Sequence, residues 1–130
     1  LKRPLGEVLL TPTIIYVNPI LSLIKKFSIH ALAHITGGGL FENLPRVLPK
    51  NVKPVINKKC IPTPPVFKFL KEKGCVPETE MWRVFNMGIR FVVVASSKEA
   101  DKVVEHLKKQ CCRANIIGHI DTSARRHVGT

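Results

Sequence analysis

Three consecutive glycines, Gly37 to Gly39, lie between two segments of regular pattern. Residues 28–36 alternate between two faces and predict a strand, and residues 40–48 predict a short helical segment that Pro45 interrupts. A glycine loop between a strand and a helix either forms a tight turn or lets backbone N–H groups approach a phosphate closely. The glycines match neither the GxGxxG nor the P-loop pattern, so their spacing leaves both interpretations open.

The segment before this strand is largely apolar and predicts a helix. Proline is tolerated in a helix only near the first turn. Therefore either Asn18 caps a helix that starts at Pro19, or one kinked helix covers residues 13–26. In both cases one helical face is apolar and is predicted to belong to the core. That face consists of Val17, Leu21 and Ile24.

Strands and helices continue to alternate after the glycine loop. Residues 52–57 predict a strand. A helix follows, with Thr63 as its N-cap, Pro64 at its first position and Gly74 at its end. A second short helix is predicted over residues 78–84.

The last third of the chain predicts a strand, a helix and a strand. Residues 89–95 carry β-branched side chains on both faces, which suggests an inner strand. Ser96 and Glu99 have the spacing of a capping box, and the helix that they start extends to about residue 110. Residues 115–120 predict the last strand.

The length of 130 residues allows one compact domain with an ordinary core. Alternating strands and helices indicate an α/β or α+β layered fold, although the antiparallel content cannot be read from the pattern. Residues 121–130 are polar and basic without periodicity, so we expect this tail to be frayed.

The formal net charge of +12 raises the question of a nucleic-acid partner. The excess is spread along the chain, with +7 in residues 1–59 and +5 in residues 60–130. The aromatic residues are mostly phenylalanines inside apolar runs rather than interleaved with lysine and arginine. We therefore predict no nucleic-acid binding and a solvated basic surface, part of which faces a phosphorylated small molecule.

No apolar run approaches the roughly 20 residues that cross a bilayer, so no membrane segment is predicted. The first residue is leucine and no signal-peptide pattern follows it, so we expect a piece of a longer chain. The cysteines are irregularly spaced and predict reduced thiols in a cytoplasmic protein. They are Cys60, Cys75, Cys111 and Cys112.

Several polar residues lie close to the glycine loop in sequence. His30 and His34 have the spacing of a metal-binding pair, but no third ligand is evident, so no metal site is predicted. We expect one of these histidines to line a cleft beside the loop. Thr36, Asn43 and Arg46 are candidates to complete an anion site, although Arg46 is equally compatible with the surface.

A second polar group surrounds the turn between the helix at 78–84 and the strand that follows. It contains Glu80, Arg83, Asn86 and Gly88. The alternative is an exposed ion pair between Glu80 and Arg83 at helical spacing.

Four blocks of the sequence, in order, are similar to one enzyme family. Residues 30–49, HALAHITGGGLFENLPRVLP, and residues 80–89, EMWRVFNMGI, closely resemble two signatures of the phosphoribosylformylglycinamidine cyclo-ligase (AIR synthetase) family. Residues 10–16 and 116–118 resemble its opening helix and closing strand. Arg90 departs from the pattern, because the family usually has a small glycine there.

The resemblance implies the C-terminal domain of a PurM-like enzyme, an α+β unit in α/β/α layers with a mixed sheet. It implies an enzyme of purine biosynthesis that uses ATP and Mg²⁺ to activate the formamide oxygen of formylglycinamidine ribonucleotide and closes the imidazole ring. The family's N-terminal domain, which this chain would lack, supplies the homodimer interface and much of the ATP site.

The resemblance also suggests roles for individual residues. The expected catalytic residues are His34, Glu80 and Asn86. The expected phosphate-binding residues are Thr36, Gly37, Gly38, Gly39, Asn43 and Arg46. The expected further residues of the cleft are His30, Arg83 and Gly88.

Three other interpretations stay open. One is another ATP-dependent enzyme of the PurM-like superfamily, such as the selenophosphate or thiamine-phosphate enzymes. Another is a non-catalytic basic binding module on the same fold. The third is a domain of a fused, multifunctional purine-pathway polypeptide.

Overall fold

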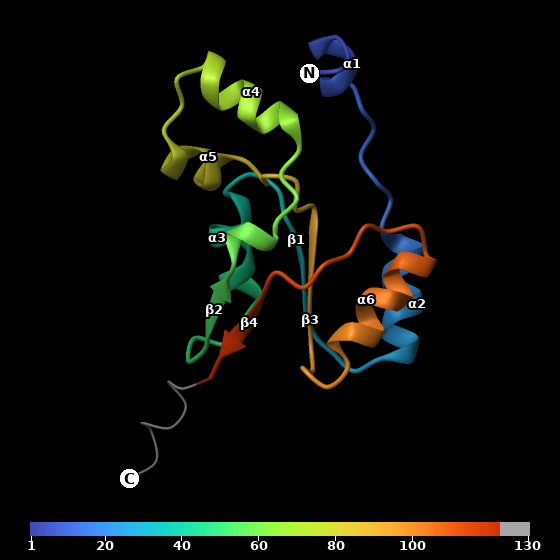
Figure 1. Ribbon diagram of the computed structural model, residues 1–130. Coiled ribbons are helices and arrows are strands. Elements are labelled where there is room, and N and C mark those ends of the chain that lie inside the picture. The colour runs from blue at the N-terminus through green and yellow to red at the C-terminus, as the bar shows by residue number, and fades with distance from the viewer. Residues whose placement is uncertain (123–130) are drawn as a thin grey trace.

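A computed structural model describes residues 1–122 of the chain (Figure 1). The helices are α1 (Leu5–Leu9), α2 (Val17–Lys26), α3 (Gly39–Asn43), α4 (Pro65–Lys73), α5 (Glu78–Val84) and α6 (Ala100–Lys109), with short 3₁₀ turns η1 (Leu44–Val47) and η2 (Lys58–Cys60). The strands are β1 (Ile29–His34), β2 (Lys53–Ile56), β3 (Phe91–Ala95) and β4 (Gly118–Asp121). The α+β class is thereby confirmed. The tail at 121–130 was expected to be frayed. Residue 121 is instead the last residue of β4, and residues 123–130 lie outside the described part of the chain.

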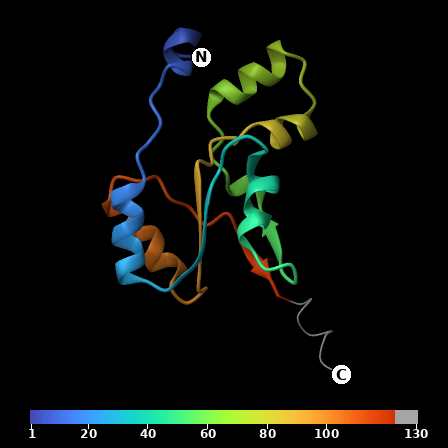
Figure 2. The same cartoon turned by 180° about the vertical axis from the view of Figure 1, so that it is seen from behind.

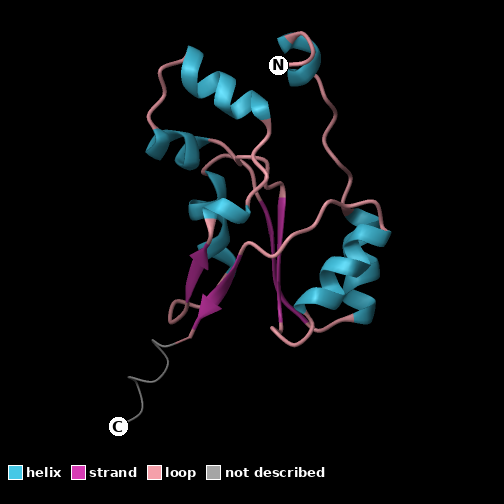
Figure 3. Cartoon of the chain, in the orientation of Figure 1, coloured by secondary structure: helices cyan, strands magenta, loops and turns pink. Residues whose placement is uncertain are grey.

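The strands form two antiparallel pairs (Figure 3). β1 pairs with β3, from Ile29 opposite Ala95 to His34 opposite Phe91, and β2 pairs with β4. Within residues 1–122 there is thus no single mixed sheet, contrary to the expectation. The reason is the path of the chain. β3 begins opposite His34, the last residue of β1, so the two strands run antiparallel.

β3 is an edge strand among the described residues, because β1 is its one partner there. The prediction of an inner strand is therefore wrong. Val92 packs in the core, and all five residues of β3 border a cavity of about 280 Å³ that Ile20, Val103 and Leu107 also line. Both faces of the strand meet apolar groups, which explains the β-branched residues without a second neighbouring strand.

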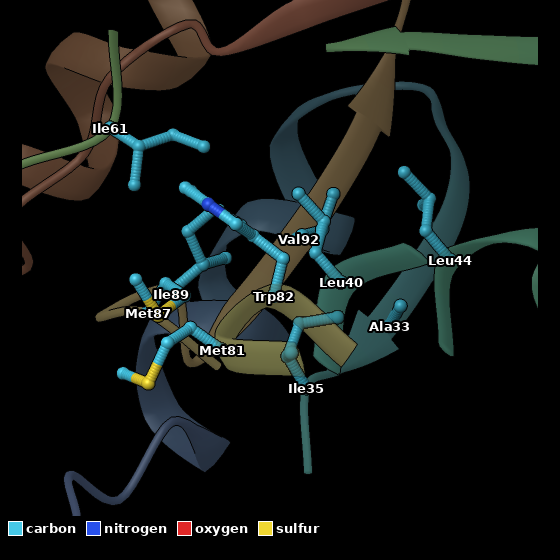
Figure 4. Close-up of a cluster of buried hydrophobic side chains, with 10 residues drawn as sticks. All are labelled: Ala33, Ile35, Leu40, Leu44, Ile61, Met81, Trp82, Met87, Ile89 and Val92. Carbon is cyan, nitrogen blue, oxygen red and sulfur yellow. The ribbon is translucent and has the colours of Figure 1, made fainter. Parts of the chain in front are cut away.

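The main core lies between the β1–β3 pair, α3 and α5 (Figure 4). Its ten buried side chains are Ala33, Ile35, Leu40, Leu44, Ile61, Met81, Trp82, Met87, Ile89 and Val92. Ala33 and Ile35 share one face of the first strand's alternation and are buried, at 4% and 2% exposed. The core therefore fixes the end of β1 that leads into the glycine loop.

Helix α2 presents a different face to the protein from the one predicted. Val17, Leu21 and Ile24 are 60%, 52% and 48% exposed, so the prediction that they are core is wrong for the described chain. The face that contacts the rest of the protein contains Leu23, which is fully buried, and Ser22, whose hydroxyl lies 3.0 Å from Nε2 of His106 on α6. Figures 1 and 2 both show α2 and α6 side by side. Packing on α6 selects one helical face and leaves the other outward.

The helix ends also differ in detail from the predictions. The bounds of α5 are confirmed, but Pro64 rather than Thr63 precedes the first residue of α4. Glu99 precedes α6 without a side-chain capping bond, and Ser96 contributes its backbone carbonyl instead. The pattern did not predict α1, which has no buried residue. No helix in residues 1–122 combines the length and apolar character needed to span a membrane.

Candidate functional site

The glycine loop turns through left-handed backbone. Gly38 and Gly39 have φ angles of 92° and 60°, which residues with a Cβ rarely adopt. The N–H of Gly39 donates to the carbonyl of Thr36 at 3.1 Å and closes the turn. A methyl group at Gly37 would meet no atom within 4 Å, so the loop is open at this position.

The opposite side of the loop packs tightly against the end of α5. A methyl group at Gly39 would lie 2.4 Å from the carbonyl oxygen of Trp82 and 2.9 Å from that of Phe85. Neither oxygen belongs to a flexible side chain. Glycine is therefore required at this position for the close approach that joins the two sequence signatures in space.

Asn43 fastens the loop from within. Its side-chain nitrogen donates hydrogen bonds to the carbonyl oxygens of Gly37 at 3.0 Å and of Gly39 at 2.8 Å. Asn43 itself is 9% exposed. The amide was expected to contact a phosphate, and in this structure its donors face the loop's own carbonyls. It thus holds the loop in shape.

Two exposed charges flank the loop on α3 and η1. A methyl group at Gly38 would lie 2.6 Å from a carboxylate oxygen of Glu42. The same carboxylate is 3.9 Å from the guanidinium of Arg46. The side chain of Arg46 is 66% exposed in this pair, so its guanidinium is accessible to solvent.

Glu80 and Arg83 on α5 form a two-pronged ion pair, with hydrogen bonds of 2.9 and 2.6 Å. These bonds lower the pKa of Glu80 below its usual range and raise the pKa of Arg83, to which the nearby charge of Glu42 adds. The carboxylate is therefore ionised at neutral pH. It accepts hydrogen bonds and orients the guanidinium rather than acting as a proton donor.

Asn86 shapes the turn that leads from α5 into β3. Its side-chain oxygen accepts the N–H of Gly88 at 3.0 Å. Gly88 has a φ of 95°, and a methyl group there would lie 2.4 Å from the ring of Pro64. The turn thus locks the second signature against the segment that precedes α4.

His34 lies at the end of β1 in an aromatic cluster. Its ring stacks on Phe91 with centroids 5.8 Å apart, and Tyr16 contacts both rings edge-on or tilted. Burial raises the pKa of Tyr16, and the charge of Arg90 partly opposes this rise. Arg90, the residue that departs from the family pattern, also lines the cavity beside β3.

The remaining histidine candidate lies elsewhere. His30 is exposed near the opposite end of β1, roughly 13 Å along the strand from His34. Residues 1–122 hold no group of three or more histidine, cysteine or acidic side chains that could bind a metal ion.

A further cation covers the aromatic contact between α3 and α5. Nζ of Lys58 lies 4.7 Å from the ring centroid of Trp82 and 5.3 Å from that of Phe41. The indole N–H donates to Glu78 at 2.7 Å. Hydrogen bonds from Lys71 and from this indole lower the pKa of Glu78.

The structure therefore brings the glycine loop, which Asn43 fastens, against the end of α5 at Arg83. His34 instead joins Tyr16 and Phe91, and His30 lies apart from both groups. Sequence patterns alone did not single out Tyr16, Glu42 or Lys58. Only Glu42 had a visible signal, because it lies four residues before Arg46.

Comparison with known proteins shows the family to which the chain belongs. The family model described as "AIR synthase related protein, C-terminal domain" matches residues 1–129, nearly the whole chain. The chain belongs to this family. Both signatures that meet at Gly39 thus lie within one AIR synthase related domain.

Several curated relatives of this AIR synthase related domain bear the name phosphoribosylformylglycinamidine cyclo-ligase. The protein from Fusobacterium nucleatum is 46% identical over 117 residues, which are 90% of this chain and 34% of that protein. The one from Clostridium kluyveri is 46% identical over 94% of this chain and 37% of its own. The one from Bacillus mycoides is 48% identical over 92% and 34%. The chain spans about a third of the length of these relatives.

Proposed function

We propose that the chain is the C-terminal part of a phosphoribosylformylglycinamidine cyclo-ligase of purine biosynthesis, a cytoplasmic enzyme. The supporting observation is the identity of 46 to 48% with relatives of that name over at least 90% of the chain. The enzyme converts formylglycinamidine ribonucleotide and ATP into aminoimidazole ribonucleotide, ADP and phosphate. Phosphorylation of the formamide oxygen makes it a leaving group, and attack by the amidine nitrogen closes the ring.

The part of this chain in that reaction is to hold and orient the ribonucleotide. Arg46 and the open side of the loop at Gly37 bind its phosphate, since an exposed guanidinium forms paired hydrogen bonds with such an anion. Thr36 and Gly38 border the same space, and Asn43 keeps the loop rigid. Fixed donors lower the cost of bringing the reacting groups together.

The other predicted residues line the cleft further from the phosphate. Glu80 holds the guanidinium of Arg83, whose pKa the charge of Glu42 beside the loop also raises. His34 presents an exposed ring beside Tyr16, and Asn86 with Gly88 shapes the neighbouring turn. These residues contact the ribonucleotide only when the rest of the enzyme closes the other side.

The magnesium ion does not fit the described residues. They contain no cluster of suitable ligands, and the carboxylates of Glu42 and Glu80 are already close to arginines. We assign the metal ion and most contacts to ATP to the part of the enzyme that this chain does not span. The same part supplies the homodimer interface.

An activity assay tests the proposal. A chimera in which this chain replaces the matching third of the Clostridium kluyveri protein is expected to form aminoimidazole ribonucleotide with ATP and Mg²⁺. The chain alone is expected to be inactive. A folded chimera without activity would contradict the proposal and favour another superfamily enzyme or a binding module.

A charge substitution tests the role of Arg46. Arg46→Ala in the chimera is expected to raise KM for the ribonucleotide about tenfold or more, because one charge-assisted contact to phosphate is worth about 1.5–3 kcal/mol. The matched control is Lys98→Ala, which removes an exposed cation before α6 and should leave KM unchanged. Equal KM values for both variants would exclude the phosphate contact.

A further inference from the structure

An apolar face lies on the N-terminal arm and on the outer side of α2. We call it the N-terminal apolar face, and its residues are Leu10, Ile14, Ile15, Val17, Leu21 and Ile24. Their exposed fractions range from 45% to 82%. Isolated exposed apolar side chains are normal, but a run of them on one helix face and the adjoining segment marks an interaction surface.

The arm that carries half of this face has few contacts of its own. No backbone N–H from residue 13 to 16 donates a hydrogen bond to another described residue. α1 has no buried residue, and Figures 1 and 2 show the arm as an extended link between α1 and α2. An extended segment with exposed apolar side chains and free donors is suited to lie against another surface.

The charges around the face limit what can cover it. Residues 1–28 contain Lys2, Arg3, Lys25 and Lys26 against one acidic residue, Glu7. A complementary surface is therefore apolar with carboxylates at its rim. A second copy of this chain would bring the same cations together and carries a net charge of +12 itself, which opposes self-association.

We propose that the N-terminal apolar face docks on the remaining two thirds of the cyclo-ligase polypeptide, an inference that rests on the proposed function. The matched relatives extend well beyond this domain, because the chain spans only 34% to 37% of their length. That additional polypeptide is the protein surface available to every such domain. Docking through α2 also steadies Tyr16, which immediately precedes α2 and contacts His34 in the proposed site.

Hydroxyl-radical footprinting tests the docking because it measures the exposure of individual side chains. The chain alone is compared with the chimera that contains the rest of the Clostridium kluyveri protein. Oxidation at Leu10, Ile15 and Leu21 is expected to fall at least threefold in the chimera. Oxidation at Val55, which is 44% exposed on β2, is expected to stay unchanged.

A matched pair of variants gives a second readout. Ile24→Asp in the chimera is expected to return the oxidation of Leu10 and Ile15 toward the value in the chain alone. Ile116→Asp, at a residue of nearly equal exposure (49% against 48%), should not.

Three results would overturn the docking proposal. One is equal oxidation of the face in the chain and in the chimera. Another is protection in the chain alone that grows with its concentration, which would indicate a second copy. The third is protection by anionic lipid vesicles with none in the chimera. If the chimera protects the N-terminal apolar face but does not close the ring, the proposed activity is wrong and the docking stands. If it closes the ring without protecting this face, the docking is wrong and the activity stands.

Discussion

At the scale of single residues, the site depends on groups that position others. Asn43 satisfies carbonyl oxygens of the glycine loop, Glu80 orients Arg83, and Asn86 holds the N–H of Gly88. Each of these residues was predicted to touch the substrate. Their hydrogen bonds to other residues of the protein show that they first fix the loop, the guanidinium and the turn in place. A ligand can bind to these groups only when their positions are fixed.

Substitution of Asn43 tests this positioning. Asn43→Ala is expected to lower the free energy of unfolding by about 1–3 kcal/mol, since it removes the side-chain donor to the carbonyl oxygens of Gly37 and Gly39. Urea unfolding, followed by the fluorescence of Trp82, the one tryptophan of the chain, measures it. Asn51→Ala, at an exposed turn, is the control and should cost much less. An equal loss in both variants would show that the loop does not depend on Asn43.

Tyr16 offers a test of burial at the arm's junction with α2. It is the one tyrosine of the chain, so the ultraviolet absorbance of tyrosinate reports it alone. Burial raises its pKa, so it should titrate above the ordinary value near 10. Arg90→Ala should raise this pKa further, because the charge of Arg90 favours the phenolate.

The sign of the linked stability follows from this pKa. A phenol whose pKa is higher in the folded state stabilises the fold fully below the unfolded pKa. That contribution is lost as the pH rises through the folded pKa, so the urea midpoint should fall in this range. The unfolded chain in denaturant is the reference. A native pKa at or below the reference would mean that Tyr16 is not buried at this junction.

At the scale of elements, the glycine loop and α5 form one unit. Gly39→Ala must bear the roughly 1–2 kcal/mol of left-handed strain. It must also displace the carbonyl of Trp82, which would lie 2.4 Å from the new methyl group. We expect it to destabilise the fold clearly more than Gly37→Ala, whose methyl group meets open space. Thermal unfolding of both variants decides this, and similar melting temperatures would contradict the tight contact.

Element predictions from the sequence succeeded where the signal was local. The bounds of α5 follow from its composition, and the core of each strand follows from alternation or from an apolar run. The outward face of α2 and the edge position of β3 were not predictable in the same way. Periodicity shows that a face is apolar, but it does not show which neighbouring element, or which other polypeptide, covers that face.

The candidate site shows the same limit. Residues 34–46 are adjacent in sequence, so the motif by itself places His34, the loop and Arg46 in one short stretch of the chain. Their meeting with Arg83 and the approach of Tyr16 to His34 depend on packing between distant segments. Such contacts leave no local pattern, so only the resemblance of the second signature pointed to α5.

At the scale of the whole molecule, the two strand pairs differ in how far their residues are buried. The β1–β3 pair contains buried residues and borders the core, whereas no residue of β2 or β4 is buried. The cavity of about 280 Å³ lies along β3 and the segment that leads into β4. The β2–β4 pair should therefore open locally at a lower free energy than the β1–β3 pair.

Hydrogen exchange at two comparable amides measures this difference. Ile35 N–H donates to Arg90 at 2.9 Å beyond the first pair, and Asn57 N–H donates to Ile117 at 2.8 Å beyond the second. The bonds are alike in length, but Ile35 is 2% exposed and Asn57 is exposed. After correction for intrinsic rates, the amide of Asn57 should exchange at least tenfold faster. Equal protection with the same urea dependence would instead show that both pairs unfold as one cooperative unit. The cavity beside β3 would then not separate the stabilities of the two pairs.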